Sequence, residues 1–142
     1  MNASDLTFDE MTQGLQNTHD YTISEDVYTA FLAASGDRSP IHVDEVSAKA
    51  AGFEGCVMHG SILNAFISHF VGMVFPGKHA LLLGVNLRYA NPSYLGDMLR
   101  VSAQVVQRVE SQSVIEMNVV IENITRGVRA ASGKILSKVR AP

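Results

Sequence analysis

The sequence predicts an α+β fold in which a curved antiparallel β-sheet wraps around one long central α-helix. Two patterns indicate this fold. Between residues 57 and 77, apolar side chains recur at three- and four-residue steps, which is typical of an amphipathic helix. After that helix, apolar and polar residues alternate in several stretches, which is typical of half-buried antiparallel strands with one solvated face. Wrapping one sheet around the helix buries both apolar surfaces economically.

Length and composition indicate one domain over residues 1–142. Of the 142 residues, 46% are hydrophobic and 18% are charged, a balance that favours a buried core over disorder. The formal net charge is −3 and the 11 lysines and arginines form no run, so a nucleic acid is not expected as a partner. The longest apolar stretch, residues 62–75, is interrupted by polar side chains and is too short to cross a membrane.

The cysteine content and the first residues favour a cytoplasmic location. The single cysteine, Cys56, cannot form an intrachain disulfide, which fits a reducing compartment. The N-terminus carries acids and lacks the basic start and apolar stretch of a signal peptide.

The first predicted elements are a short strand over residues 19–23 and a capped helix. Ser24 is a suitable helix N-cap, and Glu25 and Asp26 place negative charge in the first turn, where the helix dipole favours it. The helix is expected to stop at Gly36, since glycine commonly terminates helices.

A loop and a short helix are predicted next. Residues 37–42 are expected to form the loop, because Pro40 fixes its own backbone and pushes the preceding residue toward an extended conformation. The short helix covers residues 44–51, and Gly52 and Gly55 end it.

The long helix that follows has two different faces. Its apolar stripe is expected to lie in the core and consists of Leu63, Phe66, Ile67, Phe70, Val71 and Val74. Its other face is made of small residues, so that a strand, a partner helix or a ligand can approach closely; it carries Ser61, Ala65, Ser68 and Gly72. Pro76 and Gly77 end the helix.

Four strands are predicted after the long helix, over residues 84–90, 97–105, 113–123 and 127–139. Gly133, inside the last of them, suggests a bulge or a close backbone contact. Such a sheet leaves unpaired backbone groups on its edge strands, and pairing two edges in a homodimer would satisfy them.

Three segments of the chain resemble the MaoC-like hydratase family, the (R)-specific enoyl-CoA hydratases. They are SGDRSPIHVDE from Ser35, AKAAGFEGCVMHG from Ala48 and ANPSYLGD from Ala90, and the resemblance extends from about Ser24 to the C-terminal strands. It implies a single hotdog domain, a dimer with active sites near the subunit interface, and the reversible hydration of trans-2-enoyl-CoA to (3R)-hydroxyacyl-CoA. No cofactor is expected. The family often has asparagine where this chain has Ser39, which is expected to alter loop detail only.

The chemistry of hydration assigns roles to residues of these motifs. The reaction requires a water that is held and deprotonated, a proton for the α-carbon and a stabilised thioester oxygen. Asp37 and His42, on one rigid loop, are expected to hold the water and to share the acid and base work. The N–H of Gly60, at the start of the long helix beside His59, is expected to donate to the thioester oxygen.

Substrate binding is assigned to His59, Ser61 and Ser68, and the resemblance implies a substrate contact at Ser68. Purely structural roles are the alternatives. Asp37 alone would be expected to cap a turn. His59 could anchor the loop from a buried position, and Ser68 could simply permit close helix packing.

Other functions on this fold are an acyl-CoA thioesterase, in which a carboxylate activates water against the carbonyl carbon, and a non-catalytic protein that binds acyl thioesters. A metal site made of His42, Asp44 and His59 is not expected, because no compact metal motif is present. His69 and His79 have no partner at ligand spacing and are expected to be incidental.

Overall fold

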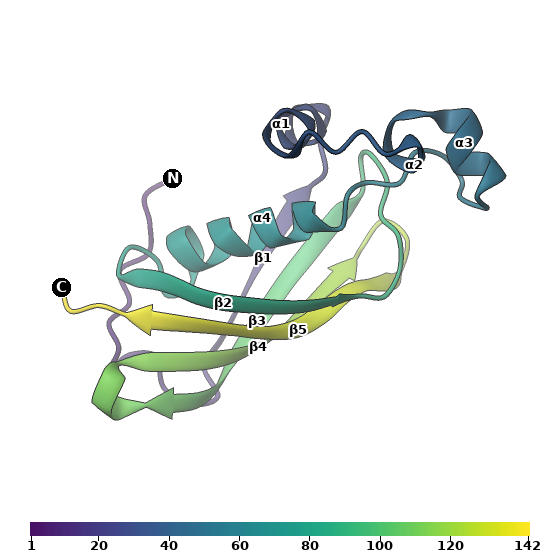
Figure 1. Ribbon diagram of the computed structural model, residues 1–142. Coiled ribbons are helices and arrows are strands. Elements are labelled where there is room, and N and C mark those ends of the chain that lie inside the picture. The colour runs from purple at the N-terminus through teal and green to yellow at the C-terminus, as the bar shows by residue number, and fades with distance from the viewer.

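The computed structural model describes residues 1–142 and contains one five-stranded antiparallel sheet curved around a helix (Figure 1). The strand order is β1-β3-β4-β5-β2. The strands are β1 (Gln16–Thr22), β2 (Ala80–Tyr89), β3 (Met98–Val109), β4 (Val114–Asn123) and β5 (Val128–Val139). The predicted α+β architecture is therefore confirmed. None of the helices has the length and hydrophobicity needed to traverse a lipid bilayer.

The inner face of the sheet is built from the alternating residues of β3 and β4. Their side chains are buried as predicted: Leu99, Val101, Ala103, Val105, Ile115, Met117, Val119 and Ile121. The two edge strands extend beyond their predicted bounds. The start of β1 is polar and carries no apolar signal, and the residues Ala80–Leu83 that open β2 are uniformly apolar and do not alternate.

Gly133 makes the close backbone contact that its position suggests. It pairs with Leu87 across β5 and β2, and a Cβ at this position would collide with the carbonyl oxygen of Asn86. The register irregularity between these strands lies elsewhere, between Leu82 and Gly84.

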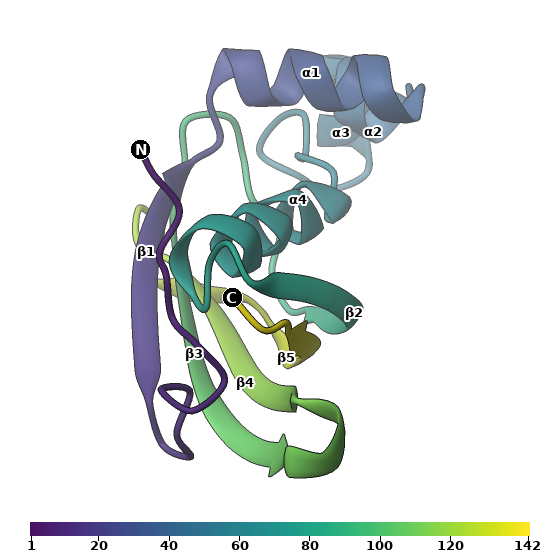
Figure 2. The same ribbon diagram turned by 90° about the vertical axis from the view of Figure 1, so that its left-hand side faces the viewer.

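The long helix α4 (Ser61–His69) lies inside the curve of the sheet, as Figure 2 shows. It continues as a π-helical turn over Phe70–Val74, so the predicted single helix widens in its last turns. The predicted apolar stripe is buried, from Leu63 to Val74. The small face points away from the core, with Ser61, Ala65 and Ser68 exposed.

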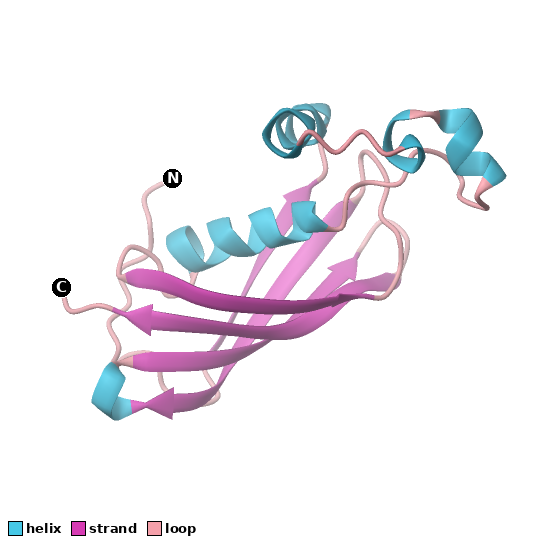
Figure 3. Ribbon diagram, in the orientation of Figure 1, coloured by secondary structure: helices cyan, strands magenta, loops and turns pink.

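Helix α1 (Glu25–Ser35) has the predicted ends. The Ser24 hydroxyl accepts the N–H of Val27 at 3.2 Å, and Gly36 follows the helix in the left-handed region with φ +67°. Helix α1 lies over the first turns of α4, and two short helices lie beyond the N-terminal end of α4 (Figure 3).

The two short helices correct one prediction. Helix α2 (Pro40–Val43) occupies part of the segment expected to be a loop, because the fixed φ of Pro40 suits the first position of a helix as well as an extended turn. His42 therefore lies on a helical turn. Helix α3 (Glu45–Ala50) forms where predicted, with Asp44 as its N-cap; Gly52 lies in the turn that follows it, whereas Gly55 lies further on.

Candidate active site

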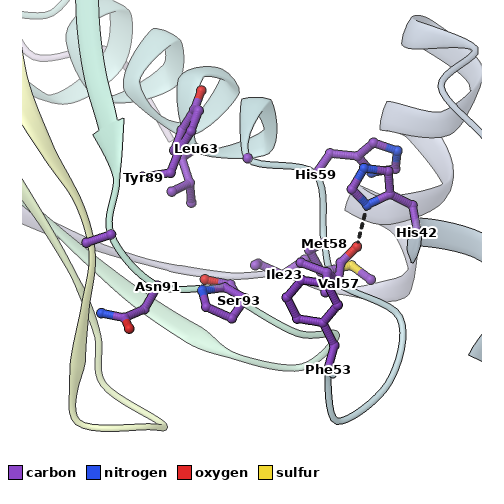
Figure 4. A pocket seen from close by; sticks show the side chains of 13 residues that line it. Ile23, His42, Phe53, Val57, Met58, His59, Leu63, Tyr89, Asn91 and Ser93 are labelled. Carbon is purple, nitrogen blue, oxygen red and sulfur yellow. Dashed lines mark hydrogen bonds between the residues drawn. The ribbon is translucent and has the colours of Figure 1, made fainter. Parts of the chain in front are cut away.

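Three polar side chains from different segments meet beside the opening end of α4. The His42 Nε2 atom lies 3.7 Å from the Asp37 Oδ2 atom, and the His59 Nε2 atom lies 3.9 Å from the same oxygen. The two imidazole rings stack with their centroids 3.9 Å apart. The chain thus brings together the predicted acid–base pair and the predicted neighbouring histidine (Figure 4 shows the two histidines).

The orientation of His42 is set by a backbone carbonyl. Its Nδ1 atom lies 2.7 Å from the Val57 carbonyl oxygen. Because a carbonyl oxygen only accepts, Nδ1 carries the proton, and in the neutral ring Nε2 is left with a free lone pair facing Asp37. Figure 4 shows this hydrogen bond. Sequence reasoning missed the role of Val57, because a backbone acceptor carries no side-chain signal.

Tyr28 supports the same residue from the other side. Its hydroxyl donates to the His42 carbonyl oxygen at 2.6 Å. Burial raises the pKa of this tyrosine, so the hydroxyl keeps its proton and remains a donor. The sequence predicts that Tyr28 lies in a helix. It does not predict the hydrogen bond from Tyr28 to His42, which joins residues 14 positions apart.

The two carboxylate oxygens of Asp37 have different surroundings: one is hydrogen-bonded and the other is not. Oδ1 accepts the N–H of Ser39 at 3.0 Å, which is the turn-capping role considered as an alternative. Oδ2 faces the two histidines at distances beyond ordinary hydrogen bonding. The side chain is 49% exposed. A water between Oδ2 and His42 Nε2 would satisfy both atoms.

His59 has the anchoring geometry of its structural alternative. It is 4% exposed, and its Nε2 atom donates to the Asp37 carbonyl oxygen at 2.8 Å. Phe31 packs against the ring at a centroid distance of 4.9 Å. The hydrogen bond between His59 and Asp37 connects the Asp37 turn to the start of α4. The remaining nitrogen, Nδ1, is buried and has no partner in the chain.

A pocket of about 320 Å³ opens beside these residues. It is lined by Ile23, His42, Phe53, Val57, Met58, His59, Gly60, Leu63, Tyr89, Ala90, Asn91, Pro92 and Ser93. In Figure 4, Tyr89 and Leu63 lie on the side opposite the histidines, and Phe53 lies below them. Just over half of the lining residues are hydrophobic, and polar side chains lie on both sides of the pocket, with the two histidines on one side and Asn91 and Ser93 on the other (Figure 4).

Gly60 lines this pocket and has a free backbone donor. Its backbone N–H has no acceptor in the chain and lies just before the first turn of α4. The Tyr89 ring covers the residue so closely that a Cβ on Gly60 would lie 3.1 Å from it. The Tyr89 hydroxyl donates to Asn64 Oδ1 at 2.6 Å, which holds the ring in place.

The two predicted serines do not line the pocket. Ser61 and Ser68 both lie on the exposed face of α4. Their roles in substrate binding stay predictions.

The site also contains a possible metal-ligand set that differs from the one considered in the sequence. Donor atoms of Asp37, His42 and His59 lie within 4.8 Å of one another. His59 Nε2 is bonded to a carbonyl oxygen and carries a proton, so it does not offer a lone pair to a metal. Asp44 caps α3 and binds the Ser47 hydroxyl at 2.6 Å.

Comparisons with known proteins agree with the geometry. The model of the MaoC like domain family matches residues 8–126. The (R)-specific enoyl-CoA hydratase of Aeromonas caviae is 29% identical over 110 residues, which are 78% of this chain and 81% of that protein. The protein of the same name from Rhodospirillum rubrum is 29% identical over 118 residues, 81% of this chain and 82% of its own. The unliganded R-hydratase PhaJ1 from Pseudomonas aeruginosa superposes with a TM-score of 0.89 at 27% identity, covering 99% of this chain and 89% of that structure.

Proposed function

The chain belongs to the family of MaoC-like domains, and from that premise we propose that it is an (R)-specific enoyl-CoA hydratase, a hydro-lyase. Its hotdog fold matches the solved R-hydratases. The reaction adds water to trans-2-enoyl-CoA and gives (3R)-hydroxyacyl-CoA, and it is reversible. One observation carries the proposal: His42 Nε2 and Asp37 Oδ2 lie 3.7 Å apart beside a pocket that is also lined by Gly60, whose N–H has no acceptor in the chain.

In the proposed mechanism the water lies between His42 Nε2 and Asp37 Oδ2. The pair removes one proton from the water while its oxygen bonds to the β-carbon of the enoyl group. The electrons of the double bond move toward the thioester carbonyl, and the pair returns a proton to the α-carbon on the same face. All atoms of the water are thereby added to the substrate. Because the two groups form a coupled pair, the proton transfers belong to both together.

The Gly60 N–H is the proposed donor to the thioester oxygen. Negative charge develops on this oxygen as the water attacks, and a fixed donor stabilises that charge most where water is excluded. The Tyr89 ring lies against Gly60 in the same pocket. The acyl group would lie against the apolar lining around Leu63.

We also propose that the protein works as a homodimer in the cytoplasm. Strand β2 pairs only with β5 and leaves its other edge open. Leu81 and Leu83 on this strand are each about half exposed. An open strand edge with exposed apolar residues favours association with a second copy. The single cysteine, Cys56, remains the argument for a reducing compartment.

The proposed reaction is tested with crotonyl-CoA and a longer trans-2-enoyl-CoA. The parent protein is expected to remove the conjugated enoyl absorbance without releasing free thiol, and the product should be the (3R)-hydroxyacyl-CoA. His42→Ala is expected to lower kcat by about 10²- to 10⁴-fold, the usual contribution of a positioned acid–base group. Release of free thiol would instead identify a thioesterase, and substrate binding without turnover would identify a binding protein. Either result would overturn the proposal.

A further inference from the structure

We propose that Arg126 is a positioning residue for His42, acting through the segment 53–58. This segment, here called the strap, contains the Val57 carbonyl that orients the His42 ring. The kinetic consequence of the inference rests on the proposed hydratase function. Its structural part, the state of the His42 ring, does not.

The strap is held between two parts of the chain. On one side, the Val57 N–H donates to the Ile41 carbonyl at 2.9 Å, while the Val57 carbonyl accepts from His42. On the other side, Val57 forms a bridge with Tyr94, and the Met58 N–H donates to the Ser93 carbonyl at 2.9 Å. Any shift of the strap therefore moves the acceptor of the His42 Nδ1 proton.

Arg126 ties the strap to the β4–β5 turn. Its Nη1 atom binds the Glu54 carboxylate on the strap. Its guanidinium lies over the Tyr94 ring, 4.1 Å from the centroid. The Tyr94 hydroxyl in turn accepts the Glu54 N–H at 3.3 Å. One side chain thus contacts both the strap and the loop that pairs with it.

The anchor of Arg126 is a buried carboxylate. The Asp97 side chain is 3% exposed, and its Oδ2 atom accepts the Arg126 Nε–H at 2.7 Å. The same oxygen accepts the side-chain amide of Asn123 at 2.7 Å and the Tyr94 N–H at 2.9 Å. A buried ion of this kind needs its partner, so Arg126 has a fixed place in the fold. Because Arg126 is held in place by Asp97, its bond to Glu54 restrains the position of the strap.

The consequence for His42 concerns its tautomer. The Val57 carbonyl selects the form with a proton on Nδ1, which leaves Nε2 able to accept a proton from water. If the strap loosens, Nε2 carries the proton for part of the time and cannot act as the base. A displacement of about 1 Å at such a group can cost about a hundredfold in rate.

The test measures the His42 ring directly, by ¹⁵N NMR of protein with labelled histidine, together with kcat and KM. The variants are Arg126→Ala, which removes the anchor, and Glu54→Ala, which removes only the strap contact and leaves the Arg126–Asp97 pair intact. Both are expected to convert His42 from the Nδ1–H form to a mixture. Both are expected to lower kcat by about ten- to a hundredfold, with a smaller change in KM. Arg126→Lys, which keeps the charge beside Asp97, is expected to recover part of the loss.

A second arginine–glutamate pair supplies the matched control. Arg129 Nε binds Glu122 Oε1 at 3.3 Å between two exposed side chains, and no hydrogen bond or ion pair joins Arg129 to the strap. Arg129→Ala is expected to leave the ring signals and the kinetics unchanged.

The NMR signals of His42 and the kinetics of the variants decide whether the inference holds. Folded Arg126→Ala and Glu54→Ala proteins that keep the Nδ1–H form of His42 and the parent kcat would overturn it. If Arg126→Ala does not fold, the exposed Glu54→Ala variant decides the question. If the parent shows no hydratase activity, the proposed function fails, and the NMR result still decides whether the strap orients His42.

Discussion

Two histidine–aspartate contacts lie beyond opposite ends of the helical segment 61–74, and they differ in whether the facing atoms are bonded to each other. Beyond the closing end, His79 Nε2 lies 2.7 Å from Asp5 Oδ1, and Lys78 Nζ lies 2.8 Å from Asp5 Oδ2. At the opening end, Asp37 and His42 are 3.7 Å apart, and the facing atoms have no close partner. The first pair is a closed structural contact, whereas the second has room for a water.

The sequence gives no sign of the first of these two contacts. His79 was expected to be incidental, but it is buried and tied to the N-terminal segment. Asp5 also forms a bridge with Gly77, so the chain end is fastened to the turn after the π-helical segment. An aspartate next to a histidine is therefore not by itself a sign of catalysis; what matters is whether the atoms that face each other are left without a close partner.

The largest expected contrast comes from removing one carboxylate charge at each end. Asp37→Asn is expected to lower kcat on enoyl-CoA by about 10²- to 10⁴-fold, with little change in Tm, because the amide oxygen can still accept the Ser39 N–H. Asp5→Asn is expected to lower Tm and to leave kcat unchanged, because it removes the negative charge that binds Lys78 and His79, far from the pocket. Steady-state kinetics and thermal unfolding of both variants check this. An active Asp37→Asn protein would remove the distinction between the two ends.

A smaller contrast is expected from adding one methyl group at each end of the helical segment. Gly60→Ala places a Cβ 3.1 Å from the Tyr89 ring, so the ring must move from its place over the pocket. We expect a loss of about tenfold in kcat/KM from this displacement. Gly72→Ala meets nothing within 4 Å, and it should keep full activity and unfold at the same or a higher temperature, since alanine favours helices by about 1 kcal/mol over glycine.

Comparing kcat/KM and Tm for the two alanine variants checks that expectation. Equal activity in both would show that the position of Tyr89 over Gly60 does not affect turnover.

The smallest expected effect is the pH dependence of the stability that the Asp5 contacts with Lys78 and His79 provide. Hydrogen bonds from Lys78 and then from His79 lower the pKa of Asp5 below its ordinary value. A lowered carboxyl pKa in the folded state stabilises the fold above the unfolded pKa of about 4 and loses that effect as the pH falls through the folded pKa. The Tm difference between the parent and Asp5→Asn should therefore be present at neutral pH and shrink in acid. A difference that is constant with pH would mean that the Asp5 charge does not matter.

Much of the fold could be predicted from local patterns. The alternation in β3 and β4 and the three- and four-residue spacing in α4 correspond to burial, because each reflects the geometry of one element. The helical turn at Pro40–Val43 was missed, since proline is compatible with both a turn and a helix start. The Asp5–His79 contact was missed because it joins residues 74 positions apart.

The candidate site also contains residues that the sequence predicts and residues that it does not. Asp37, His42 and Gly60 carry their signal in residue type and spacing, and the structure brings them to one place. The Val57 carbonyl has no side-chain signal at all. Arg126 reads in the sequence as one of several scattered basic residues, and its contact with Glu54 depends on tertiary folding.

The strand order also has a consequence for how the chain is made on a ribosome. Strand β2 has a single neighbour in the sheet, β5, which is the last strand of the chain. At about 5–20 residues per second, the stretch from Tyr89 to Val139 takes about 3–10 s to synthesise. During those seconds the apolar stripe of α4 has been made while the sheet that covers it is unfinished. The nascent chain is therefore most exposed to aggregation, and most in need of a chaperone, just before its last strand emerges.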